Sequence, residues 1–125
     1  MRTILVVEDY GPWRQLVAGW LREAGFVVIE AGDVETAVKR AERPGSIDAC
    51  VVDSLLPGAQ PFDLGSRLRE LQPAAAALRM SGHDPAELRR AGLLGERELM
   101  LRKPFSRDQL LEAVDAALGA SSDRR

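Results

Sequence analysis

Short apolar runs alternate along the chain with segments in which apolar residues recur at helical spacing. Residues 3–7 (Thr-Ile-Leu-Val-Val) are apolar and mostly β-branched, which is typical of a strand covered on both faces. Similar runs predict strands over 26–29, 47–52, 74–80 and 98–102. The 74–80 strand rests on its place in the alternation, because its four alanines are poor strand formers.

The intervening segments carry the start and stop signals of amphipathic helices. The predicted helices lie between Pro12 and Gly25, Asp33 and Pro44, Pro57-Gly58 and Pro73, Pro85 and Leu94, and Ser106 and Leu118. Asp33 is a predicted N-cap, and Ser106 with Gln109 has the spacing of a capping box. Trp13, Trp20 and Cys50 are predicted to pack in the core.

Five strand–helix units in succession predict an α/β fold with a doubly wound parallel sheet and helices on both faces. The 125 residues fit one domain, which we place at residues 1–120. Residues 121–125 are predicted to be a frayed polar tail.

Composition narrows the range of functions. The net charge of −2 favours neither nucleic acid nor an anionic membrane as a partner. No apolar run approaches the ~20 residues of a membrane-spanning helix, and the N-terminus has no signal-peptide core. The single Cys50 excludes an internal disulfide and a multi-cysteine zinc site. We therefore expect a cytoplasmic protein.

Polar residues follow four of the five predicted strands. Glu8-Asp9 ends the first, Asp53 the third and Ser81 the fourth, while Lys103 follows the fifth. Ligands of parallel sheets bind at the carboxyl ends of the strands, so these side chains are expected to converge on one pocket.

Three carboxylates gathered in one pocket repel each other, by ~4 kcal/mol for two charges ~4 Å apart at an effective dielectric of 20. Such a cluster needs raised pKa values, a cation, or both. Oxygen ligands suit Mg²⁺ or Mn²⁺, and Lys103 supplies a fixed positive charge. A carboxylate beside these cations can attack a phosphoryl group and hold it as an aspartyl phosphate.

The chain resembles the receiver domains of two-component response regulators over residues 3–118. The matching motifs are Val6-Val7-Glu8-Asp9, Asp53-x-x-x-Pro57-Gly58, Ser81-Gly82 and Lys103-Pro104-Phe105. The resemblance implies a flavodoxin-like receiver fold with sheet order 2-1-3-4-5. It also implies a signalling phosphoacceptor, which assists its own Mg²⁺-dependent phosphorylation and dephosphorylation without being an enzyme for a separate substrate.

By this resemblance, Asp53 accepts a phosphoryl group from a histidine kinase or phosphotransfer protein. Asp9 and Asp53 bind the metal, Glu8 holds it mainly through water, and the Leu55 backbone carbonyl is a further ligand.

Two more roles follow from the resemblance. Ser81 bonds the phosphoryl oxygens after moving toward them, and Lys103 pairs with the phosphate. The Lys103–Pro104 peptide is expected to be cis.

The chain departs from the family pattern at several positions. Met100 stands where an aromatic switch residue is usual, and Pro61 replaces a glycine. Leu55 and His83 occupy the two positions that tune dephosphorylation. Because Leu55 cannot position an attacking water, we expect a long-lived phosphoryl group.

The resemblance also implies that the face formed by the fourth helix, fifth strand and fifth helix docks a downstream protein. A homodimer through this face is a second expectation. Neither direct nucleic-acid contact nor membrane contact is expected.

Several alternatives stay open. The chain could be a receiver-like interaction module that does not switch. A haloacid-dehalogenase-type phosphatase needs an Asp where Leu55 stands, and a dinucleotide-binding protein needs the missing G-x-G-x-x-G. Ser81 could be a turn residue, His83 a loop residue and Met100 an ordinary core residue. Glu8, Asp9 and Asp53 could be strand-end charges and Lys103 a surface lysine.

Overall fold

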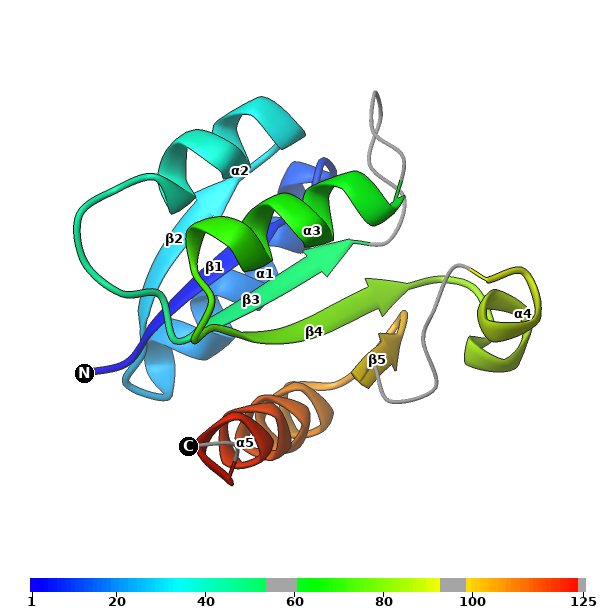
Figure 1. Ribbon diagram of the computed structural model, residues 1–125. Coiled ribbons are helices and arrows are strands. Elements are labelled where there is room, and N and C mark those ends of the chain that lie inside the picture. Colours follow the sequence, from blue (N-terminus) through cyan, green and yellow to red (C-terminus); the bar gives the residue numbers. More distant parts are fainter. Residues whose placement is uncertain (54–60, 93–98, 124–125) are drawn as a thin grey trace.

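A computed structural model describes residues 1–53, 61–92 and 99–123, with a central sheet of five parallel strands (Figure 1). The strands are β1 (Thr3–Val7), β2 (Val27–Ala31), β3 (Ala49–Asp53), β4 (Ala76–Ser81) and β5 (Leu99–Arg102). Their order across the sheet is β2-β1-β3-β4-β5, as the resemblance implied. The predicted doubly wound α/β fold is confirmed.

Five described helices accompany this sheet, and four of them cover its two faces. The helices are α1 (Gly11–Glu23), α2 (Val34–Ala41), α3 (Pro61–Leu71), α4 (Pro85–Arg90) and α5 (Arg107–Asp123). One core forms between the sheet and α1 with α5, and the other between the sheet and α2 with α3. Figure 1 shows α4 beyond the carboxyl end of β4, away from both layers. None of the described helices is long and apolar enough to cross a membrane.

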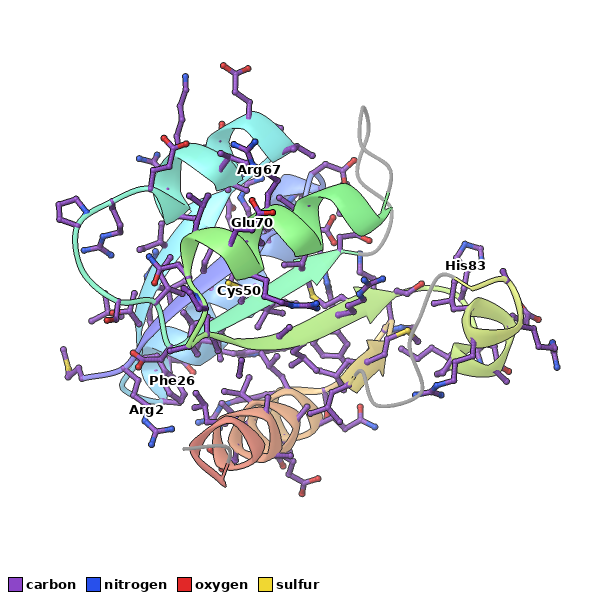
Figure 2. The ribbon with its side chains drawn as sticks, in the orientation of Figure 1. Arg2, Phe26, Cys50, Arg67, Glu70 and His83 are labelled. Atoms are coloured by element: carbon purple, nitrogen blue, oxygen red, sulfur yellow. The ribbon has the colours of Figure 1, made fainter. Side chains whose placement is uncertain are left out.

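Of the predicted core residues, Cys50 is buried, whereas Trp13 and Trp20 are partly buried and pack against the core. Cys50 is 4% exposed and belongs to the core under α2 and α3, where Figure 2 shows it between β3 and α3. Trp13 and Trp20 pack edge to face, with ring centroids 6.2 Å apart, on the opposite side of the sheet. Trp13 also meets Phe105 at 4.9 Å, which joins α1 to the segment that precedes α5.

Local hydrogen bonds explain where two helices begin. The Asp33 carboxylate accepts a hydrogen bond from the Thr36 N–H at 2.7 Å, as an N-cap does. Ser106 and Gln109 form the predicted capping box, in which each side chain accepts from the other's backbone N–H.

Several element ends differ from the prediction; for example, β4 covers Ala76–Ser81 and α4 ends at Arg90. Strand β2 continues to Ala31, and β3 begins at Ala49. The Asp48 carboxylate just before β3 accepts a hydrogen bond from the Thr3 N–H at 2.7 Å. Helix α5 continues to Asp123, into the segment that was expected to be a frayed polar tail. Residues 119–123 contain no proline, the residue that would break a helix there.

Candidate functional site

The three acidic residues predicted to share a pocket lie together at the carboxyl edge of the sheet. Glu8 and Asp9 follow β1, and Asp53 ends the neighbouring strand β3. Val7 pairs with Val52 in the parallel register, so the chain leaves both strands at the same level. One carboxylate oxygen from each of Glu8, Asp9 and Asp53 lies within 4.8 Å of the others.

Glu8 is fully buried. Burial, which disfavours the charged form, raises the pKa of its carboxyl to about 7, and the neighbouring Asp53 and Asp9 carboxyls act in the same direction. Hydrogen bonds from Lys103 and from the Tyr10 backbone N–H oppose this rise. Glu8 is therefore a carboxyl that changes charge near neutral pH.

Lys103 places its ammonium group between two of the carboxylates. Its Nζ atom donates to Oδ2 of Asp53 at 3.1 Å and forms an ion pair with Oε1 of Glu8. Burial acts to lower the pKa of Lys103, but the hydrogen bonds and charges of Glu8 and Asp53 raise it above its ordinary value. The lysine therefore stays protonated and offsets part of the acidic charge.

Backbone contacts fix Lys103 at this place. Its N–H donates to the Ser81 carbonyl at 2.7 Å, which extends the β4–β5 ladder beyond the last strand pair. The Lys103–Pro104 peptide is cis, as expected. The residue after that proline, Phe105, is buried against Trp13.

The donor set fits a hard divalent cation. All three acidic groups offer carboxylate oxygens, the ligand type that Mg²⁺ and Mn²⁺ prefer. Asp9 is exposed whereas Glu8 is buried, so a cation at Asp9 would keep waters of its own. Leu55, the fourth expected ligand, lies outside the described residues.

Ser81 ends β4 at the same edge and is only 1% exposed. Its Oγ accepts a hydrogen bond from the His83 N–H at 3.0 Å, which is the turn geometry considered as the alternative role for this serine. His83 itself is exposed, and Figure 2 shows its imidazole pointing away from the sheet. The loop interpretation of His83 agrees with this placement.

Met100 is half-buried on β5 and pairs with Arg79 of β4. Because side chains alternate along a strand, Met100 and Arg79 lie on the face opposite to Leu101, which packs against the core of α1 and α5. Ser81 pairs with Arg102, one position further along the ladder from Leu101.

One contributor to the site was missed in the sequence. Arg14 of α1 donates to the backbone carbonyl of Glu8 at 2.9 Å and forms an ion pair with Glu30 of β2 at 3.3 Å. Nothing in the spacing of these residues signals the contact. Only the docking of α1 across β2 brings them together.

Comparison with known proteins identifies the family. The sequence profile of the response regulator receiver domain matches residues 4–115. The chain belongs to this family. Receiver domains act in two-component signalling, where they interact with histidine kinases or phosphotransfer proteins. They are signalling phosphoacceptors and generally not classical enzymes.

Among curated relatives, the transcriptional regulatory protein TcrA of Mycobacterium tuberculosis is 35% identical over 90% of this chain and 44% of TcrA. The chain thus spans about half the length of the curated relatives it matches.

Solved receiver structures have the same fold. A response regulator receiver protein from Sinorhizobium medicae is 26% identical with a TM-score of 0.82, and the match covers 96% of each chain. The response regulator TrrA of Thermotoga maritima, in complex with Mg²⁺ and BeF, is 25% identical with a TM-score of 0.79. That match covers 94% of this chain and 99% of TrrA.

Proposed function

We propose that Asp53 of this receiver domain accepts a phosphoryl group from a histidine kinase or phosphotransfer protein in a Mg²⁺-dependent reaction. The observation that carries the proposal is the position of Lys103, whose ammonium bridges Asp53 and Glu8 beside the three clustered carboxylates. A carboxylate held this way is oriented and next to a cationic group, as a nucleophile toward phosphorus requires.

The transfer forms a bond between a carboxylate oxygen of Asp53 and phosphorus, and it breaks the phosphorus–nitrogen bond of the donor phosphohistidine. The histidine leaves with the electron pair of that bond. Lys103 offsets charge on the phosphoryl oxygens, and Asp9 with Glu8 and the Leu55 carbonyl would hold the cation. A bound Mg²⁺ would supply further charge neutralisation at those oxygens. The Mg²⁺ and BeF bound by TrrA support this assignment.

Ser81 would bond a phosphoryl oxygen after releasing its turn hydrogen bond from His83. The effect of phosphorylation would then reach the face formed by α4, β5 and α5, where a downstream protein or a second copy would dock. Met100 stands at the position where an aromatic residue usually couples the serine to that face.

The relative TcrA is a transcriptional regulatory protein, so one relative of this chain regulates transcription. For this chain, we predict a cytoplasmic location without direct nucleic-acid or membrane contact. The receiver domain is predicted to cover residues 1–120 and the polar tail residues 121–125.

Intact-mass measurement tests the phosphoacceptor. The protein is incubated with a small acyl phosphate and Mg²⁺, and then with Mg²⁺ replaced by a chelator. We expect one phosphoryl adduct that hydroxylamine removes, which is absent with chelator and absent in Asp53→Ala. Asp115→Ala, at an exposed position of α5, is a matched control that keeps the adduct. An unchanged adduct in Asp53→Ala would move the site to another residue.

The second candidate is a receiver-like interaction module that does not switch. The engagement of the Ser81 hydroxyl in a turn and the thioether at Met100 favour it. A stoichiometric adduct on Asp53 without any change in amide hydrogen exchange over α4, β5 and α5 would support this candidate. Altered exchange over those elements would support the switching receiver.

A further inference from the structure

Arg14 connects three parts of the molecule next to the acidic cluster. Its guanidinium donates from one terminal nitrogen to the Glu8 carbonyl at 2.9 Å, and its Nε meets Oε1 of Glu30 at 3.3 Å. The Arg14 and Glu30 side chains are only 22% and 28% exposed. The guanidinium thus spans α1, β2 and the segment after β1.

The contact falls on the peptide that joins the two acidic residues. The Glu8 N–H donates to the Ala31 carbonyl at 3.0 Å, while its own carbonyl accepts from Arg14. That carbonyl belongs to the peptide unit leading into Asp9. The backbone N–H and carbonyl of Glu8 are thus both hydrogen-bonded. Rotation of the Glu8–Asp9 peptide would break the charge-assisted hydrogen bond from Arg14.

Glu30 holds the other side of the guanidinium. Oε2 of Glu30 also forms an ion pair with a terminal nitrogen of Arg22 at 3.2 Å. Arg22 lies on α1, as Arg14 does, and it also donates to the Val28 carbonyl. Arg22 therefore shares the Glu30 carboxylate with Arg14. Within the described part of the chain, neither hydrogen bond of the Arg22 guanidinium reaches Glu8, so Arg22 offers a matched comparison.

Gly32 leaves space for this arrangement. A Cβ atom at Gly32 would lie 3.0 Å from the Arg14 terminal nitrogen and 4.0 Å from the Glu8 carbonyl oxygen. The backbone of Gly32 is outside the left-handed range, so an alanine there meets crowding and not backbone strain. Because Arg14 is tied to two partners, it cannot yield to that Cβ without lengthening one of its hydrogen bonds.

We propose that Arg14 is a positioning residue for the metal-binding carboxylates, acting through the Glu8 carbonyl, and that Gly32 preserves the space it needs. The inference rests on the proposed function, since it concerns the cation that Asp9 and Glu8 would hold. Residues that hydrogen-bond to metal ligands, without touching the metal, hold those ligands in place. Their removal typically weakens metal binding about 10–100-fold.

Isothermal titration of Mg²⁺ into the full chain tests this. Arg14→Gln is expected to weaken Mg²⁺ binding about tenfold, whereas Arg22→Gln stays within about twofold of wild type. Thermal unfolding of both variants is measured in parallel, because both lose an ion pair to Glu30. A purely structural role would lower the melting temperatures and leave the two Mg²⁺ affinities alike.

Gly32→Ala gives an independent route that keeps the arginine. It is expected to weaken Mg²⁺ binding in the wild-type background and to add nothing in the Arg14→Gln background. Equal Mg²⁺ affinities of Arg14→Gln and Arg22→Gln, or a full effect of Gly32→Ala in the absence of Arg14, would overturn the positioning role. A wild-type protein that binds no Mg²⁺ and gains no Asp53 adduct would instead overturn the proposed function itself.

Discussion

The Nζ atom of Lys103 donates a hydrogen bond to Oδ2 of Asp53 at 3.1 Å, across 50 positions of sequence. The same ammonium pairs with the buried Glu8 carboxylate, so one positive charge is shared by two acids. The ionisation of Glu8 and the charge of Lys103 should therefore both govern the stability of the fold around the site.

Replacement of Lys103 by Met should destabilise the fold in a pH-dependent way. At pH 7 the variant removes the cation that stabilises the ionised form of Glu8, at a cost of about 1–3 kcal/mol. At pH 5 Glu8 is protonated in both proteins, because its pKa is about 7, and the cost should shrink. Urea unfolding in the presence of chelator measures the difference at both pH values.

Lys103→Arg is the control for charge, and it should retain most of the stability at pH 7. An equal loss for Lys103→Met at pH 5 and pH 7 would show that pairing with ionised Glu8 does not account for the effect.

Wild-type stability without metal should fall as the pH rises from 5 to 8. The Glu8 pKa is about 7 in the folded protein against an ordinary value of 4.5, so the folded state binds a proton that the unfolded state has lost. Folding is therefore favoured at low pH, and this contribution disappears as the pH rises through 7. The full span of this contribution is up to about 3 kcal/mol.

Glu8→Gln should remove most of that pH dependence, as measured by urea unfolding at several pH values in chelator. Glu35→Gln is the matched control, because Glu35 pairs with Lys39 on the exposed surface of α2 and should leave the slope unchanged. A slope that persists in Glu8→Gln would assign the titration to another group.

The placement of the acidic site was predictable because parallel strands deliver their carboxyl ends to one edge. Asp53 ends a strand and Lys103 follows one, and that position alone predicts their convergence. The ion pair of Lys103 with Glu8 was not predicted, since strand order does not fix which carboxylate a flexible lysine reaches. The contacts of Arg14 with Glu8 and Glu30 were missed for a related reason. They depend on how α1 is oriented over β2, which apolar periodicity does not specify.

The reactivity of Cys50 should report on opening of the core. It is 4% exposed, and burial raises the pKa of its thiol to about 12. The thiolate fraction at pH 8 is then about a thousandfold below that of a thiol with the ordinary pKa of 9.0. Labelling by an aromatic disulfide in native buffer should therefore be slower than labelling in urea by at least about that factor.

The competing possibility is direct access through the cavity of about 70 Å³ beside Cys50, lined also by Leu68 and Arg79. Ala77→Leu offers a control, since it adds bulk to the wall of that cavity. Fast labelling of the native wild type that Ala77→Leu slows would show that reagent enters through the cavity without global unfolding.

The phosphoryl group on Asp53 should be longer-lived than in a Leu55→Asn variant. Leu55 lies outside the described residues, so this prediction rests on its chemistry. An isobutyl side chain offers no hydrogen bond to a water, whereas an amide can orient one for attack on phosphorus. Decay of the adduct after removal of the phosphodonor, followed by intact mass, gives the half-life of each protein. His83→Ala serves as the comparison at the second tuning position, where the exposed imidazole should matter less. A wild-type half-life no longer than that of Leu55→Asn would refute a stabilising role of the apolar side chain.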